Sequence, residues 1–312
     1  MSRLWWKRNY TPDQVALCLN SSFFGFFAHS GFLHSLTMSG FTPGHISGAS
    51  AGALVAGLYA SGLDTGRICA LLRDPRIASV FRERGSMWRL FRTLIGREGA
   101  TGALAGHQGR ALLRDYLGER RIEECSRARL AISVANLSRV ESELLRHGKI
   151  VDAVLASCAV PGMFAAQAVG ADLYWDGGVA DPVPFEHWLE DRRVRLIVIH
   201  LALNTAELQS RAAPHRFGFY GGLARSHQII SDEIYRLKSE LARRAGKRLL
   251  VYRTITPRPG PHLLNLGPRC QQMGARTATR AAHELGAMVR LTAARGDHAG
   301  KNIAPGRSRK QL

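Results

Sequence analysis

Gly48-Ala49-Ser50-Ala51-Gly52 is the stretch that decides the fold of this 312-residue chain. It lies between a short apolar segment ending at Ser47 and a Gly/Ala-rich run, 51–62, that predicts a helix. A Gly-x-Ser-x-Gly at a strand-to-helix junction is typical of the nucleophile elbow of serine hydrolases. The glycines are needed because a Cβ two residues either side of the strained serine would clash with the neighbouring chain. A small-residue turn that lets a helix pack tightly on a sheet is the alternative.

A second motif, Asp176-Gly177-Gly178, follows a stretch of alternating polarity. Taken alone, an aspartate followed by two glycines marks a turn, because Asp tolerates and Gly favours a positive φ. Paired with the serine, it predicts a carboxylate on a tight loop that accepts the proton of Ser50 directly. Burial beside an apolar wall, such as Trp175, would raise the pKa of Asp176 toward the range that a base needs at neutral pH.

Three stretches, in order along the chain, resemble the patatin-like phospholipase family. They are 17–19 with 29–33, the elbow 48–54, and 153–164 with the Asp-Gly-Gly motif. The resemblance covers residues 14–190. It implies an α/β fold, a three-layer sandwich with a mostly parallel central sheet flanked by helices, and a Ser–Asp dyad without histidine. Ser50 would be the nucleophile and Asp176 the base, and the substrate would be a lipid ester, whose acyl group passes through an acyl-enzyme to water or another acceptor.

The loop after the first predicted strand departs from the family pattern. Members of the family usually carry a glycine-rich loop there, with a basic residue, which supplies backbone N–H groups to the oxyanion. Those glycines fall on Ser21, Ser22, Phe23 and Phe26, and the basic residue falls on Gly25. Either this loop turns differently or the oxyanion hole is poor, and losing one donor costs about 10²- to 10³-fold in rate. The candidate oxyanion and elbow residues are Ser21, Ser22, Gly25, Gly48, Ala51 and Gly52.

Two other functions stay open at this point. A hydrolase with a Ser-His-Asp triad needs a histidine after the acid. Seven are available: His187, His200, His215, His227, His262, His283 and His298. The other alternative is a degenerate relative of the family that binds lipid or a partner without turnover, and the missing loop glycines motivate it.

The chain is strongly basic, with 43 Lys and Arg against 24 Asp and Glu and a net charge of +19. Such a field attracts anionic surfaces, so an anionic membrane surface is the expected partner besides the lipid ester. Genomic base composition that favours arginine codons is the alternative reason for the charge. No helix-turn-helix, zinc-finger or RNA-binding signature is present, and no specific nucleic-acid partner is expected.

Cysteine spacing predicts neither a metal site nor a disulfide framework, and no cofactor is expected. The five cysteines are scattered, with no Cys-x-x-Cys and no paired Cys/His cluster. Reduced thiols and the absence of a recognisable secretory signal predict a cytoplasmic protein, peripheral at the membrane where it meets lipid. The uncharged stretches 46–63 and 153–171 are interpreted as buried walls of the active site rather than membrane spans, because small residues fill the first and Pro161 interrupts the second.

Some apolar residues have two interpretations. The arm 1–13, with two tryptophans, either docks on the domain or sits at a membrane interface. Segment 73–98 alternates arginines with apolar residues, and Trp88, Phe91 and Ile95 recur at helical spacing. That helix either packs on the core, lies in a bilayer interface or forms a lid. The phenylalanines of 23–27 either pack the loop onto the sheet or line an acyl-chain pocket.

Elsewhere the chain alternates predicted strands and helices, which indicates an α/β layered fold. The predicted strands are 14–19, 130–137, 194–203 and 249–254. The predicted helices are 28–38, one starting after the N-cap Asp64, 106–116, 150–159, 217–245 and 274–295. We expect 14–190 to form the catalytic core, 191–296 to complete the same domain, and 297–312 to form a mobile basic tail.

Overall fold

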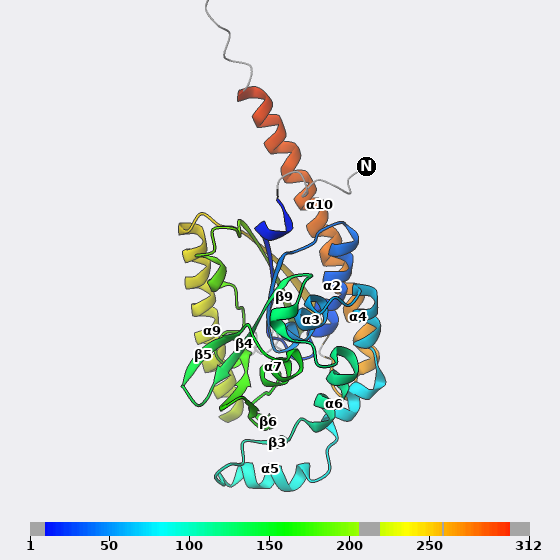
Figure 1. The fold of residues 1–312 in the computed structure, drawn as a ribbon, viewed down its shortest axis with the longest axis vertical. Helices are drawn as coiled ribbons and strands as arrows, with labels where there is room; N and C mark the ends of the chain where they lie inside the picture. The colour runs from blue at the N-terminus through cyan, green and yellow to red at the C-terminus, as the bar shows by residue number, and fades with distance from the viewer. Residues whose placement is uncertain (1–9, 206–218, 258, 300–312) are drawn as a thin grey trace, which may run out of the picture.

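Helices and strands alternate around one large sheet (Figure 1). The computed structural model describes residues 10–205, 219–257 and 259–299. The strands are β1 (Val15–Leu19), β2 (His45–Ala49), β3 (Gly102–Leu104), β4 (Arg129–Asn136), β5 (Glu141–Leu145), β6 (Gly162–Phe164), β7 (Gln167–Val169), β8 (Asp172–Asp176), β9 (Leu196–Asn204) and β10 (Arg248–Thr256). The helices are α2 (Phe26–Met38), α3 (Ala51–Ala60), α4 (Thr65–Leu71), α5 (Ser86–Leu94), α6 (His107–Leu117), α7 (Ile150–Ser157), α9 (Phe219–Arg244) and α10 (Gly267–Ala299).

The large sheet has the strand order β10-β9-β1-β2-β4-β8-β7, and β5 also pairs with β4. Neighbouring strands from β10 to β4 are parallel. Strands β5, β8 and β7 add antiparallel pairs at one end, and β3 with β6 forms a separate two-stranded sheet. The expected fold class, a mostly parallel sheet flanked by helices, is therefore confirmed.

Strand β1 shows why helices cover both faces of the sheet. All of its residues are buried. Val15, Leu17 and Leu19 belong to one hydrophobic core, whereas Ala16 and Cys18 belong to a second. The first core includes side chains of α2, α3 and α10, and the second includes side chains of α9 and the 3₁₀ turn η5 (Glu186–Trp188). A parallel strand buried on both faces needs such a continuous apolar sequence.

Most predicted elements appear within a few residues of their expected bounds. The side chain of Asp64 caps α4 by accepting hydrogen bonds from two backbone amides of its first turn. The predicted start of the last helix is wrong, because α10 begins at Gly267 and Pro268 falls in its first turn, where no amide hydrogen bond is lost. Strands β3, β5, β6 and β7 are additions to the prediction, since segments this short carry too little periodicity.

The described residues include only part of the predicted N-terminal arm and C-terminal tail. Residues 1–9 of the expected arm and 300–312 of the expected tail lie outside the described residues, while α10 continues through the expected tail boundary to Ala299. The division of the chain into arm, core and tail stays a prediction. The uncharged stretches form β2 with α3, and the end of α7 with β6 and β7. In the described part of the chain, no helix combines the length and the apolar character needed to cross a bilayer.

Candidate active site

The elbow at the end of β2 holds Ser50 in a strained backbone conformation. Ser50 has φ 52° and ψ −119° and directly precedes α3. A Cβ on Gly48 would overlap the backbone of Gly52, and a Cβ on Gly52 would overlap the carbonyl of Leu19 in β1. Close passage of the chain therefore requires both glycines, as the motif predicts.

Strand β4 sets the separation between the serine and the aspartate. In the parallel pairing with β2, Ser133 lies opposite Ala49, and in the antiparallel pairing with β8, Val134 lies opposite Asp176. The residue after Ala49 can therefore reach the last residue of β8 across one intervening strand. The Ser50 Oγ donates a hydrogen bond to Asp176 Oδ2 at 2.6 Å. The structure thus brings together the two side chains that the motifs singled out.

The environment of Asp176 shifts its acidity toward neutral pH. Asp176 is 4% exposed, and its Oδ1 accepts a hydrogen bond from the backbone N–H of Gly178 at 2.7 Å. Burial raises the pKa of Asp176 from 3.8 to about 7, although the hydrogen bonds from Ser50 and Gly178 act in the opposite direction. The predicted wall, Trp175, does not line the pocket described below. A carboxylate with this pKa can both take up and return a proton near pH 7.

Two anchors that the sequence analysis missed hold the elbow and the aspartate loop. Ser157 Oγ, at the end of α7, accepts a hydrogen bond from the amide of Ser50 at 2.9 Å and donates one to the carbonyl of Ser133 at 2.7 Å. Lys238 of α9 is buried, and its Nζ contacts both carboxylate oxygens of Asp181 at 2.8 and 2.9 Å. Ser157 lies within the stretch 153–164 that carries the resemblance, whereas no local signal in the sequence marks the lysine.

Gly177 and Gly178 let the aspartate loop approach its neighbours closely. A Cβ on Gly177 would overlap the carbonyl of Ser133 in β4. A Cβ on Gly178 would overlap the side chain of Ser21 from the loop after β1. The Asp-Gly-Gly motif is therefore a packing requirement as well as a turn.

The loop after β1 turns at a phenylalanine rather than at a glycine. Phe24 has φ 57° and is 5% exposed. Its ring stacks on Phe81 with a centroid separation of 5.4 Å and also contacts the rings of Phe23 and Phe26. Aromatic packing thus stabilises a backbone conformation that costs on the order of 1–3 kcal/mol. The positive φ that this loop requires is therefore taken by Phe24, and the choice between a different turn and a poor oxyanion hole stays a prediction.

Two of the candidate oxyanion donors already donate their amide hydrogen to a backbone carbonyl. The amide of Ser21 donates to the carbonyl of Pro182, and the amide of Gly25 donates to the carbonyl of Ser22. Neither amide is therefore directed at a reacting group. Ala51 occupies the first position of α3, where backbone N–H groups have no acceptor within the helix. Ser22 and Ala51 stay as the candidate donors, since both line the pocket beside Ser50.

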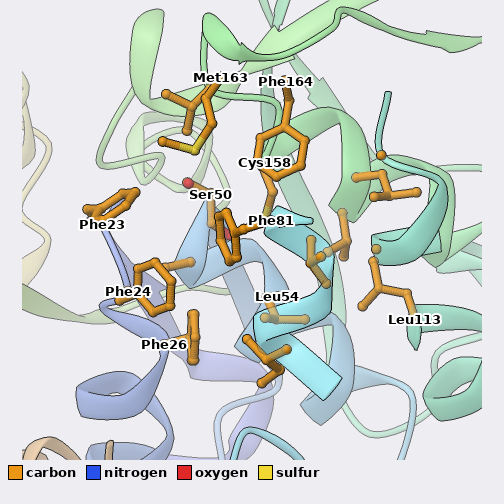
Figure 2. Close-up of a pocket in the computed structure, with 18 of the residues that line it drawn as sticks. Phe23, Phe24, Phe26, Ser50, Leu54, Phe81, Leu113, Cys158, Met163 and Phe164 are labelled. Atoms are coloured by element: carbon orange, nitrogen blue, oxygen red, sulfur yellow. The ribbon is translucent and has the colours of Figure 1, made fainter. Parts of the chain in front are cut away.

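An apolar pocket opens beside Ser50, which Figure 2 shows among aromatic and aliphatic side chains. Its walls come from the loop after β1, the 3₁₀ turn η2 (Pro75–Phe81), α3, α6, α7 and β6. Besides Ser50, the polar side chains that line it are Ser22 and Gln167. Phe23, Phe24 and Phe26 line the pocket, whereas Phe27 is buried in the hydrophobic core. Phe24 and Phe26 also belong to that core, so they pack the loop and line the pocket at once. The binding of an acyl chain in this pocket stays a prediction.

In the described part of the chain, no histidine hydrogen-bonds Ser50 or Asp176. His200, the candidate on an apolar strand, is buried, and its Nδ1 lies 2.8 Å from the Nδ1 of His29 while its Nε2 lies 2.8 Å from Thr254 Oγ1. Burial lowers the pKa of His200, and it lowers the pKa of His29 to about 4. Both rings are therefore neutral and engaged with each other. The side chains of His215 and His298 lie outside the described residues.

The described residues offer neither a group of metal ligands nor a reactive thiol beside Ser50. Among residues 10–205, 219–257 and 259–299, no group of three or more His, Cys, Asp or Glu side chains is arranged to hold a metal ion. Cys158 lies next to the elbow, with its Sγ 3.3 Å from the carbonyl of Ser50. Burial raises the pKa of this thiol, so the thiol stays protonated at neutral pH. The expectation of no metal and no cofactor stays a prediction.

Comparison with known families bears directly on this site. The patatin-like phospholipase family matches residues 17–188, more than half of the chain, and the match includes Ser50 and Asp176. The chain belongs to the patatin-like phospholipase family. The resemblance carried by the three quoted stretches is thereby confirmed, and the matched range agrees closely with the expected 14–190.

Curated relatives and solved structures resemble this patatin-like chain more distantly. Uncharacterized NTE family proteins of Mycobacterium bovis and Mycobacterium tuberculosis are 29% identical over 187 residues, which cover 57% of this chain and 46% of theirs. The chain thus spans about half the length of these relatives. VipD from Legionella pneumophila has a TM-score of 0.45 at 16% identity, covering 87% of this chain and 68% of VipD. The type III effector protein ExoU has a TM-score of 0.39 at 11% identity, covering 88% and 54% of the two chains.

Proposed function

We propose that this patatin-like protein is a lipid acyl hydrolase that cleaves a lipid ester through a Ser50–Asp176 dyad. The 2.6 Å hydrogen bond from Ser50 Oγ to Asp176 Oδ2 is the observation that carries the proposal. Membership of the patatin-like phospholipase family supports the lipid substrate class, and the apolar pocket beside the serine suits an acyl chain.

The proposed reaction passes through an acyl-enzyme. Asp176 takes the proton of Ser50 as the Oγ attacks the ester carbonyl carbon. The amides of Ala51 and Ser22, together with the N-terminal end of α3, stabilise the oxyanion. As the oxyanion collapses, the bond to the alcohol breaks and Asp176 returns its proton to the leaving oxygen. Asp176 then deprotonates a water molecule, which attacks the acyl-serine, and the proton returns to Ser50.

Direct transfer to a carboxylate favours esters over amides. An alkoxide leaving group needs less protonation than an amine, so a weakly basic partner is sufficient. The raised pKa of Asp176 moves this carboxylate toward the basicity that the step requires. A Ser-His-Asp relay does not fit this site as well, because the Ser50 hydroxyl already donates to the carboxylate itself.

A fluorophosphonate probe tests the proposal. We expect covalent labelling of Ser50 in the purified protein, identified by mass spectrometry of the labelled peptide, and no labelling of the Ser50→Ala variant. Ser157→Ala is not a suitable control, because Ser157 holds the elbow. The matched control is Ser61→Ala, at the other end of α3, which should label like the wild type. Absence of labelling at Ser50 would instead favour the degenerate protein that binds lipid without turnover.

The pH dependence of hydrolysis follows from the raised pKa of Asp176. The base must be deprotonated, so kcat/KM for a soluble uncharged ester should rise about tenfold per pH unit below the pKa. The rise should level off near pH 7, because burial places the pKa of Asp176 at about 7. The measurement is kcat/KM from about pH 5 to about pH 9, a range that extends about two pH units on either side of that pKa. A flat profile down to the usual pKa of an exposed aspartate would contradict the assignment.

A further inference from the structure

Helix α5 presents an apolar face to solvent instead of to the core. Met87, Trp88, Phe91, Leu94 and Ile95, which we call the apolar stripe, are 76%, 61%, 51%, 66% and 58% exposed. Four of them lie within α5 and the fifth is its C-cap. They occupy positions i, i+1, i+4, i+7 and i+8, which share one side of a helix. An exposed contiguous stripe of this kind marks an interaction surface.

The opposite side of α5 is fixed to the protein, so the stripe is held outward. Arg89 Nε donates to the carbonyl of Ala103 in β3 at 2.8 Å, and Arg89 Nη2 lies 3.1 Å from Glu83 Oε2. Glu83 is buried and also accepts a hydrogen bond from the amide of Ala105 at 2.6 Å. These contacts orient the helix on β3, at the lower edge of the molecule in Figure 1.

The charges around the stripe are mostly positive. Arg82, Arg84 and Arg97 are exposed, and none of them forms an ion pair with a described residue. Between 82 and 98 the acids are Glu83, which is buried against the helix, and Glu98. A basic helix with aromatic residues on its apolar side suits an anionic lipid surface.

The segments of the chain just before and just after the stripe both line the pocket. The 3₁₀ turn η2, just before α5, contributes Ile77, Val80 and Phe81 to the pocket walls. After α5 and β3, Gly106 and Gly109 line the pocket again. Arg89 holds α5 on β3, and β3 pairs with β6, whose Met163 and Phe164 also line the pocket. A surface that receives α5 therefore lies close to the walls of this pocket.

We propose that α5 docks this protein on an anionic lipid bilayer, with the apolar stripe inserted among the acyl chains and the flanking arginines at the headgroups. The delivery of a lipid ester to the adjacent pocket rests on the proposed function, whereas the docking itself does not. A second copy of the chain is a less suitable occupant, because the arginines beside one stripe would face those beside the other.

Vesicle flotation of the full chain tests the docking. The vesicles are made of ether-linked phosphatidylcholine, with or without ether-linked phosphatidylglycerol, so ester hydrolysis plays no part in the readout. We expect binding to the anionic vesicles only. Trp88→Ser with Phe91→Ser should weaken it roughly tenfold or more, through loss of inserted apolar area. Arg84→Gln with Arg97→Gln should also weaken it roughly tenfold or more.

Matched controls separate docking from general charge or unfolding. Ile229→Ser with Ile230→Ser removes two similarly exposed apolar residues from α9. Arg276→Gln with Arg280→Gln removes two exposed arginines from α10. Both controls should bind like the wild type, and all variants should keep the wild-type Tm.

Several outcomes would overturn the proposal. One is wild-type-like binding by the Trp88/Phe91 variant, and another is equal binding to neutral and anionic vesicles. Loss of binding on Trp5→Ser with Trp6→Ser alone would assign docking to the N-terminal arm. If the protein bound no vesicle but formed a dimer that the Trp88/Phe91 variant disrupts, the stripe would be the contact surface for a second copy of the chain. Loss of ester hydrolysis with intact docking would count against the proposed function alone.

Discussion

Replacing Asp176 by asparagine is expected to lower kcat for a lipid ester by about 10²- to 10⁴-fold, the contribution typical of a general base. Asparagine fills the same space and can still accept a hydrogen bond from Ser50, but its amide cannot take up the proton. The measurement is kcat on a soluble ester and on a lipid ester, with active-site titration to correct for inactive protein. Because the lost step is chemical, kcat should fall far more than KM rises.

The same variant should not unfold the protein. Burial raises the pKa of Asp176 to about 7, above its ordinary value of 3.8, so the folded protein holds this proton more tightly than the unfolded chain. The stabilisation from the protonated carboxyl is complete below the unfolded pKa and is lost as the pH rises through the folded pKa. The amide of the Asp176→Asn variant does not ionise, so the variant does not lose stability in this way as the pH rises. We therefore expect the Tm of the variant, relative to the wild type, to increase between about pH 4 and pH 7.

A nearby acid provides the matched control for this prediction. Asp172 lies on the same strand, β8, and its carboxylate pairs with Arg139 at 2.9 Å rather than with Ser50. Asp172→Asn should retain wild-type kcat within about threefold, because it removes a surface ion pair of small energetic value. If Asp176→Asn retained the activity of Asp172→Asn, the dyad assignment would be wrong.

The contact between the serine and the aspartate can be expected from the sequence only through family resemblance. The elbow and the Asp-Gly-Gly loop are recognisable because close backbone approach restricts Gly48, Gly52 and Gly177 to glycine. The distance between the two motifs depends on the register of β4 against β2 and β8. Register is set by tertiary packing, and the antiparallel pairing of β8 follows short strands that periodicity does not reveal.

The orientation of α5 shows a second limit of sequence reasoning. Trp88, Phe91 and Ile95 have the same helical spacing whether they face a core or solvent, so the pattern leaves both interpretations open. What decides between them is the buried Glu83, which holds Arg89 on the other side of the helix. A single buried acid 22 residues before the backbone amide that it binds gives no periodic signal.

Replacing Gly52 by alanine is expected to destabilise the protein strongly. The added Cβ would lie 2.6 Å from the carbonyl carbon of Leu19 and 2.9 Å from the carbonyl oxygen of Asn20. These are backbone atoms at the end of β1, in the middle of the sheet, and they cannot rotate away as a side chain can. Overpacking of this kind should cost about 3 kcal/mol or more, which corresponds to a Tm lower by roughly 5 °C or more in a chain of this length.

Two other glycines provide comparison variants that rank the expected loss of Tm. Gly57→Ala, on the same helix, places its Cβ 2.9 Å from Ile150 Cγ2, a side-chain atom that can move, and should lower the Tm less. Gly260→Ala meets nothing within 4 Å and should leave the Tm unchanged. Because Gly52 also supports the strained turn at Ser50, the Gly52→Ala protein that remains folded should react with the fluorophosphonate more slowly. Equal Tm and equal labelling in Gly52→Ala and Gly260→Ala would show that α3 does not pass this close to β1.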